Sequence, residues 1–263
     1  MKKTAVALAI IFVLAFAVSA SAGTAMDTIQ KNGVLRVATT GGQAPMTAMT
    51  KTGEVIGLDA DIAKAMAASL GVKVKFVVMP FKDLIPALEA GKVDMVLSGM
   101  TITPKRNQRV AYVGPYFVSG KGTLSLEARY AEIKQAEGLN SSEVTIAATK
   151  DSTSQEFVSK MIPKAKFQPI STPDAGIDLL LSGQVDVVVA DYPFCALAAY
   201  RYKDKNLRAG KSLTFEPLGI GLPEDTLLIN WVQNFMNTMQ GTGILEKLQK
   251  KWLSGGAWIQ ELK

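Results

Sequence analysis

One short pattern occurs twice in this chain and limits the folds that it can adopt. Residues 88–96 read Leu-Glu-Ala-Gly-Lys-Val-Asp-Met-Val, and residues 181–188 read Leu-Ser-Gly-Gln-Val-Asp-Val-Val. In each copy a helical apolar stretch reaches a glycine, and an apolar run begins shortly after it. This order predicts a helix ended by a left-handed glycine, a tight turn and a buried strand. Two such units predict two similar α/β lobes in one chain.

Strands and helices are expected to alternate along most of the sequence. One helix should carry Ile62, Met66 and Leu70 on one side, with Asp59 as its cap and Gly71 at its end. Alternation of this kind predicts an open, mostly parallel sheet in each lobe, and ligands bind such sheets beyond the carboxyl ends of the strands. The expected strands cover residues 34–39, 72–78, 93–97, 144–149, 167–170 and 185–190.

Two stretches interrupt the alternation. Residues 116–126 and 215–222 are extended, glycine-containing segments, and one complete set of strands and helices lies between them. We interpret them as two crossovers that link the lobes and act as a hinge. The first lobe is then discontinuous, with residues 23–119 and 217–263, and the second lobe comprises residues 120–216.

The first 22 residues have the three parts of a secretory signal peptide. Residues 1–3 carry two lysines, residues 5–18 are continuously apolar, and residues 20–22 (Ala-Ser-Ala) match a cleavage site without a nearby cysteine for lipid attachment. We expect cleavage after Ala22 and a mature protein in the periplasm. The alternative is a membrane anchor, but the apolar stretch is shorter than the about 20 residues that a membrane helix needs.

The composition argues against several kinds of chemistry. The chain has no histidine and one cysteine, Cys195, in an apolar helical context. We therefore expect no transition-metal site, no common nucleophile–base pair and no cofactor. Loss of residues 1–22 removes two lysines and no acid, so the formal net charge falls from +6 to about +4. Because no basic stripe interleaves with aromatic residues, nucleic-acid binding is not expected either.

Residues 98–106 can be interpreted as a carboxylate-binding site. Thr103 is expected to cap a helix, which places Arg106 in the first turn, where a cation opposes the helix dipole. A bound anion would reverse that penalty, and a guanidinium group matches a carboxylate with two hydrogen bonds. The site would comprise Thr101, Arg106 and the backbone of Ser98 and Gly99. The alternative is a solvated surface arginine beside an ordinary cap.

Two further polar positions follow expected strands. Asp191 ends the apolar run 187–190, so it either caps the next helix or pairs with a ligand ammonium group, and the two roles are compatible. Thr153 and Glu156 have the spacing of a capping box. The hydroxyl groups of Thr153 and Ser154 would also suit a carboxylate if they faced a cleft.

With these residues in view, the chain resembles the periplasmic solute-binding proteins of polar amino acid ABC transporters. The resemblance extends over essentially the whole mature chain. It implies an α/β, two-lobed periplasmic binding protein-like fold of type II, with two hinge crossovers. The segments that carry the resemblance are residues 34–39, 57–63, 84–88, 98–106, 219–223 and 241–252.

The resemblance also implies roles for individual residues. Thr101 and Arg106 would hold the α-carboxylate of the ligand. Asp191 would take the α-ammonium group, and Thr153 and Ser154 would add hydroxyl and amide contacts.

The wall of the implied site departs from the family pattern. Phe81 matches the aromatic residue that the family places over the ligand, but Gln43 and Met46 stand where the family has rings. Thr40 stands about where binders of cationic amino acids carry an aspartate, which argues against lysine, arginine or histidine as the ligand. Gln43 and Met46 would suit a small polar or acidic side chain, or a ligand that is not a standard amino acid.

The expected function is binding without catalysis. A monomeric receptor would close on an amino acid-like ligand and then dock on an ABC permease in the inner membrane. One alternative is a cyclohexadienyl dehydratase on the same fold, which needs an acid to protonate the leaving hydroxyl of prephenate or arogenate. The residues directly after Asp191 include no acid. A receptor that signals to a sensor kinase is a third interpretation.

Overall fold

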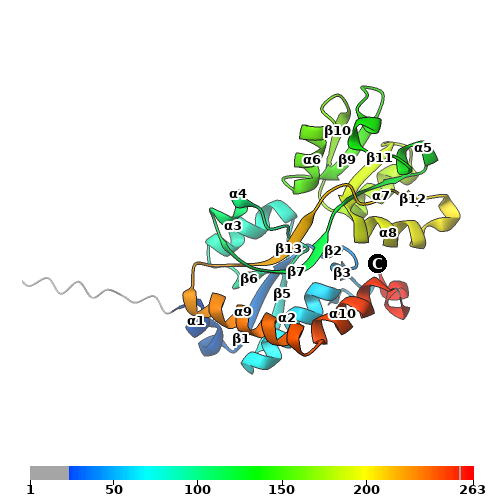
Figure 1. The fold of residues 1–263 in the computed structure, drawn as a ribbon. Coiled ribbons are helices and arrows are strands. Elements are labelled where there is room, and N and C mark those ends of the chain that lie inside the picture. The colour runs from blue at the N-terminus through cyan, green and yellow to red at the C-terminus, as the bar shows by residue number, and fades with distance from the viewer. Residues whose placement is uncertain (1–23, 255) are drawn as a thin grey trace, which may run out of the picture.

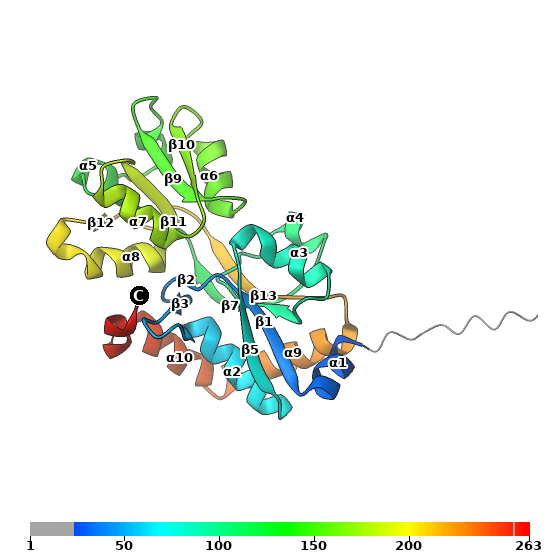
Figure 2. The same cartoon turned by 180° about the vertical axis from the view of Figure 1, so that it is seen from behind.

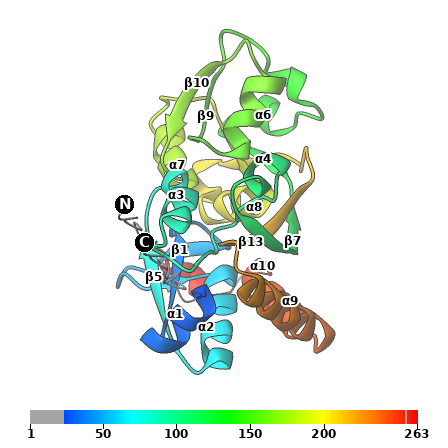
Figure 3. The same cartoon turned by 90° about the vertical axis from the view of Figure 1, so that its left-hand side faces the viewer.

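The computed structural model describes residues 24–254 and 256–263, so the expected signal peptide at residues 1–22 lies outside the described residues. Two lobes lie one above the other in Figure 1, and each contains a five-stranded sheet with helices packed against it. Figures 2 and 3 show the same division from behind and from the side. Among the described residues, no helix is long and apolar enough to cross a membrane.

The sheet of the lower lobe has the strand order β5-β1-β6-β13-β7. As alternation predicts, β1, β5 and β6 are parallel, whereas β13 runs antiparallel to β6 and β7. The strands are β1 (Val34–Thr39), β5 (Lys73–Val78), β6 (Met95–Val96), β7 (Ala111–Ser119) and β13 (Glu216–Leu222). The helices are α1 (Ala25–Asn32), α2 (Leu58–Leu70), η1 (Phe81–Asp83), α3 (Leu84–Glu89), α4 (Pro104–Asn107), α9 (Thr226–Gly241), α10 (Ile244–Leu253) and η4 (Ala257–Glu261).

The sheet of the upper lobe has the order β10-β9-β11-β8-β12, with β9, β10 and β11 parallel and β8 antiparallel to its neighbours. The strands are β8 (Lys121–Ser125), β9 (Thr145–Thr149), β10 (Lys166–Ile170), β11 (Val187–Asp191) and β12 (Arg208–Ala209). The helices are α5 (Ala128–Ala131), η2 (Ala136–Leu139), α6 (Thr153–Met161), α7 (Pro173–Leu181), α8 (Tyr192–Arg201) and η3 (Lys203–Lys205).

Two extended segments connect the sheets. Strands β7 and β13 pair with each other and run from the lower lobe toward the upper one (Figure 1). The chain leaves β7 at Ser119 and enters β8 at Lys121, and it returns between β12 and Glu216, the first residue of β13.

The repeated pattern forms the same structure in both lobes. Gly91 and Gly183 have φ values of +64° and +70°, so both turns use the left-handed conformation that the sequence predicts. The strand after the second copy, β11, is buried along its whole length. Its Val188 packs in one apolar cluster and its Val187 and Val189 in another, so this strand is covered on both faces.

Two local features differ from expectation. The N-cap of α2 is Gly57, not Asp59, which lies inside the helix and is buried. A third, small sheet joins β2 (Gly42–Gln43), β3 (Thr47–Met49) and β4 (Val55–Ile56). Strands of two or three residues are too short to show a hydrophobic period, yet this sheet positions Gln43 at the interface of the lobes.

Candidate functional site

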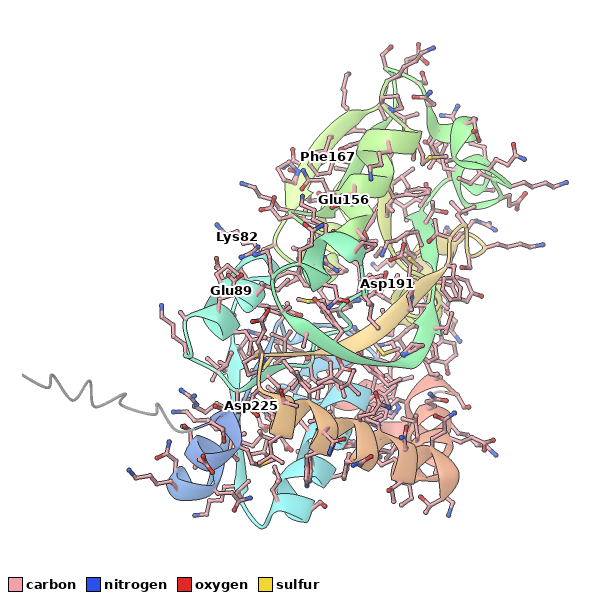
Figure 4. The ribbon with its side chains drawn as sticks, turned by 60° about the vertical axis from the view of Figure 1, so that its left-hand side comes forward. Lys82, Glu89, Glu156, Phe167, Asp191 and Asp225 are labelled. Carbon is pink, nitrogen blue, oxygen red and sulfur yellow. The ribbon has the colours of Figure 1, made fainter. Side chains whose placement is uncertain are left out.

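Strand ends and loops from both lobes face one another across a small buried cavity. Its volume is about 20 Å³, and one buried water needs about 10–15 Å³ on this measure. Asp191 lies where the two lobes meet in Figure 4. The lining residues are Gln43, Phe81, Gly99 and Thr101 from the lower lobe and Lys121, Thr149, Ser152, Thr153, Ser154, Pro173, Ala190 and Asp191 from the upper lobe.

Seven of the ten residues predicted for the site line this cavity, and the other three lie elsewhere. Arg106 lines an adjoining cavity of about 410 Å³, which shares Phe81 and Ser152 with the smaller one. Met46 is buried in the apolar core of the lower lobe. Ser98 is buried beside β1, where its Oγ accepts a hydrogen bond from the Thr40 N–H at 3.0 Å.

Arg106 is held in place by its own loop. The Thr103 side chain caps α4 by accepting from the Arg106 N–H at 3.2 Å, as the sequence predicts. The guanidinium Nη1 donates to the Thr101 carbonyl at 2.8 Å, and the guanidinium carbon Cζ lies 5.2 Å from the centre of the Phe81 ring. Burial lowers the pKa of Arg106, while nearby acids including Asp191 raise it. Arginine still remains charged in proteins, so this position presents a fixed positive charge.

The helix cap on the upper lobe is Ser152, so the expected capping box of Thr153 and Glu156 is wrong. Ser152 Oγ accepts from the N–H groups of Ser154 and Gln155 at 3.1 and 3.3 Å. With the cap one residue earlier, the Thr153 hydroxyl is available to the lower lobe. It lies 3.3 Å from the Thr101 hydroxyl, which makes a direct polar contact between the lobes.

Asp191 is the N-cap residue of α8, but its side chain makes no capping hydrogen bond. Its carboxylate instead accepts two other donors. Lys121 Nζ lies 2.5 Å from Oδ1, and Gln43 Nε2 donates to Oδ2 at 2.7 Å across the interface of the lobes. Asp191 therefore occupies the expected N-cap position without the expected capping hydrogen bond, and its side chain lines the cavity instead.

Lys121 is the site residue that the sequence analysis missed. It is 1% exposed, and Glu216 Oε2 lies 3.4 Å from its Nζ without a well-aligned hydrogen bond. The available signal was a lone lysine among small and apolar residues within the first crossover segment, residues 116–126. Only the antiparallel register of β8 and β11, which pairs Lys121 with Asp191, brings the two charges together.

A buried carboxyl group lies behind the cavity wall. The Gly99 N–H donates to Asp59 Oδ2 at 2.6 Å, and the Tyr116 hydroxyl donates to Oδ1 at 2.8 Å. Burial raises the pKa of Asp59 to about 7, although both hydrogen bonds act in the opposite direction. Asp59 therefore fixes the loop after β6 rather than capping its helix.

The sequence and the fold match a known class of proteins. Residues 35–255 match the model of the bacterial extracellular solute-binding proteins, family 3. The chain belongs to this family, and it has the two-lobed α/β fold expected for it.

Among curated relatives, the chain is 25% identical to a cyclohexadienyl dehydratase of Pseudomonas aeruginosa, over 94% of this chain and 92% of the relative. It is 29% identical to the ABC transporter glutamine-binding protein GlnH of Bacillus subtilis, over 77% of this chain and 74% of the relative.

Two solved structures are also similar to this chain. One is an ancestral amino acid-binding protein, AncCDT-1, which is described as a precursor of cyclohexadienyl dehydratase. Its sequence is 37% identical to this chain and its structure aligns with a TM-score of 0.80, over 87% of this chain and 99% of its own. The binding component of an ABC transporter from Wolinella succinogenes, in complex with lysine, is 31% identical with a TM-score of 0.81 and the same coverage.

Proposed function

We propose that this protein is the extracytoplasmic ligand-binding component of an ABC importer and binds an amino acid-like ligand between its lobes. The observation that carries the proposal is the placement of opposite charges on the two sides of the interface. Arg106 lies on the lower lobe and Asp191 on the upper lobe, around two adjoining cavities. The carboxylate and ammonium groups of a zwitterion match these charges, and charge-assisted hydrogen bonds are strong in a dry cleft. Relatives that are named as amino acid-binding proteins support this function.

The binding mode follows from the donors and acceptors. The ligand carboxylate would contact Arg106, the Thr101 hydroxyl and the region of Thr153 and Ser154. The ligand ammonium would donate to Asp191 Oδ2, in the place that the Gln43 amide takes in this structure. Phe81 would cover the ligand.

Binding of a ligand at Asp191 requires the lobes to separate, because the cavity that Asp191 lines, with a volume of about 20 Å³, is far smaller than an amino acid. We propose that residues 23–119 and 217–263 move as one body and residues 120–216 as the other. The end of β7 and the starts of β8 and β13, where the chain passes between the sheets, support these limits. The closed form would then dock on the permease as a monomer in the periplasm, after cleavage of the signal peptide behind Ala22.

Calorimetric titration with amino acids tests the proposal. Wild-type protein should bind at least one α-amino acid, and Asp191→Asn should weaken amino acids more than matching carboxylates that lack the amine. Equal losses for both ligand classes would contradict the role of Asp191 in binding the ammonium group.

A second candidate function is dehydration of prephenate or arogenate, which the relative from Pseudomonas aeruginosa favours. This reaction needs a carboxylic acid near the leaving hydroxyl. Asp191 is the one acid that lines the smaller cavity, and Lys121 and Gln43 already bond both of its oxygens. Incubation with prephenate or arogenate should therefore give no phenylpyruvate and no phenylalanine. Turnover of either substrate would replace the binding proposal with an enzymatic one.

A further inference from the structure

A buried cluster of three charged side chains lies beside the cavity, at the edge of the upper lobe where the two lobes meet. Lys121 Nζ lies 2.5 Å from Asp191 Oδ1 and 3.4 Å from Glu216 Oε2. The residues are 1%, 6% and 8% exposed, respectively. They belong to three strands, β8, β11 and β13, so the cluster lies where the chain passes from one sheet to the other.

The backbone and a threonine hold the cluster in position. The Lys121 N–H donates to Thr214 Oγ1 at 2.9 Å, and that hydroxyl donates to Glu216 Oε1 at 3.1 Å. Glu216 Oε2 is buried and has no hydrogen-bond partner among the described residues. The Glu216 carboxylate is therefore fixed beside Lys121, but its negative charge is only partly compensated by the lysine.

The formal charges of the cluster leave one negative charge at this end of the site. Lys121 contributes one positive charge, and Asp191 and Glu216 contribute one negative charge each. Arg106 contributes one positive charge at the other end. The other charged residues around the adjoining cavity are exposed, so water and salt screen them; they are Lys82, Lys105, Arg109, Asp151 and Glu156.

We infer that this cluster makes the site selective for an amino acid whose side chain carries no net charge, and that Lys121 is the residue that sets this selectivity. The inference rests on the proposed function. An α-ammonium group balances the one negative charge of the cluster, and an α-carboxylate balances Arg106. A further charge on the ligand side chain would have no partner, and burial of an unpaired charge is costly.

The contacts of Asp191 agree with a single ammonium group. Its Oδ1 is committed to Lys121, and its Oδ2 accepts one N–H donor from the lower lobe, that of Gln43. One ligand donor can replace the Gln43 amide. Without Lys121, the same end would carry two negative charges and would favour a second ligand cation.

The first experiment is a thermal-shift panel of the twenty α-amino acids with the wild-type protein. The amino acids that stabilise it most should carry uncharged side chains. If lysine, arginine, aspartate or glutamate stabilises it most, the inference is wrong while the proposed function stands. If no amino acid binds, the proposed function itself fails, which distinguishes the two outcomes.

The second experiment changes the charge of the cluster one step at a time. Calorimetry would compare the tightest neutral amino acid with 2,4-diaminobutyrate, a small cationic amino acid. Lys121→Met should shift the affinity ratio toward the cation by about tenfold or more, because unscreened charges interact strongly in a cleft. The double variant with Lys121→Met and Glu216→Gln has the wild-type net charge in the cluster. Its affinity ratio should therefore return most of the way to the wild-type value. A ratio that Lys121→Met leaves unchanged would overturn the inference.

Glu216→Gln keeps the inference testable if Lys121→Met does not fold. This near-isosteric change removes the net negative charge, so the neutral amino acid should bind about tenfold more weakly. Its α-hydroxy analogue, which lacks the ammonium group, should lose less. Parallel losses for both ligands would show that the charge of the cluster does not select the ligand.

Discussion

The backbone N–H of Gly99 donates a 2.6 Å hydrogen bond to Asp59 Oδ2, so a buried carboxyl group of α2 fixes a loop that lines the interlobe cavity. The Tyr116 hydroxyl holds the other oxygen at 2.8 Å. A helix in the core of the lower lobe is thus coupled directly to the wall of the site. The same contact makes the stability of the lobe depend on the protonation of one side chain.

Asp59→Asn should remove a pH dependence of stability. Burial raises the pKa of Asp59 from 3.8 to about 7, so between these values the folded protein holds a proton that the unfolded chain has lost. The free energy of unfolding therefore falls as pH rises through this window, by up to roughly 4 kcal/mol at 1.36 kcal/mol per pKa unit. Asparagine can accept from the Gly99 N–H through its oxygen and donate through its amide to the Tyr116 hydroxyl, and it does not titrate.

Urea unfolding at several pH values between 4 and 8 checks this prediction. The difference between wild type and Asp59→Asn isolates the contribution of the one carboxyl group, because other titrating groups are shared. Stability curves that run parallel across the window would show that Asp59 titrates normally in the folded protein.

Gly99→Ala should destabilise the protein more than Gly91→Ala. Both glycines have positive φ, +56° and +64°, so alanine is strained at either position by about 1–2 kcal/mol. At Gly91 an added Cβ meets nothing within 4 Å, whereas at Gly99 it would lie 2.9 Å from Gln43 Nε2. The Gln43 amide must then leave Asp191, at an additional cost of about 1.5–3 kcal/mol for a hydrogen bond to a charged group.

Denaturant unfolding of the two glycine variants gives the comparison. Equal losses of stability would mean that Gln43 moves aside without giving up its bond to Asp191.

The sequence predicted the architecture because its signals are local. The glycine turns at Gly91 and Gly183 and the Thr103 cap each depend on residues within a few positions of one another. The parallel strands followed from the alternation of strands and helices, which is also visible locally. The predicted cap of α6, Thr153, was wrong by one residue. Ser152, Thr153 and Ser154 can all accept an amide hydrogen bond, and only the backbone conformation of the loop selects Ser152.

The charge cluster could not be predicted in this way. Lys121 and Asp191 are 70 residues apart in the sequence and meet only through the register of two strands. Asp59 looked like a helix cap because its position near a helix start is typical of one. Its contact with Gly99 depends on how the loop after β6 lies against α2, which no local pattern contains.

Arg106→Ala should abolish measurable binding of amino acids while leaving stability close to that of wild type. The guanidinium group is the positive charge of the proposed carboxylate site, and truncation of one partner of a buried charge pair typically costs 2–5 kcal/mol, or about 30-fold or more in affinity. Arg129→Ala is a matched control, because Arg129 pairs with Glu127 on the exposed surface, away from both cavities. Calorimetry that shows retained affinity in Arg106→Ala would rule out the carboxylate role.

Cys195 should be unreactive in the folded protein. The thiol is fully buried behind Asp191, with Sγ 3.8 Å from the Ala190 carbonyl, and burial raises its pKa. Because the thiolate is the reactive form, a disulfide reagent at pH 8 should modify almost none of the native protein and one thiol per chain after unfolding in guanidinium. Rapid labelling of the native protein would show that α8 opens readily, and loss of labelling with ligand would connect that opening to the cleft.

Gln43→Ala should open the ligand-free protein and strengthen its binding of amino acids. The Gln43 amide bridges the lobes by donating to Asp191 Oδ2 at 2.7 Å, in the place proposed for the ligand ammonium. Removal of this donor takes away a contact of the closed form and a competitor of the ligand. A hydrogen bond to a charged group contributes about 1.5–3 kcal/mol, so affinity should rise by about tenfold to a hundredfold. X-ray scattering should show a larger radius of gyration without ligand, and Gln168→Ala, on the exposed surface of β10, should change neither quantity. A weaker affinity with an unchanged radius would instead identify Gln43 as a direct ligand contact.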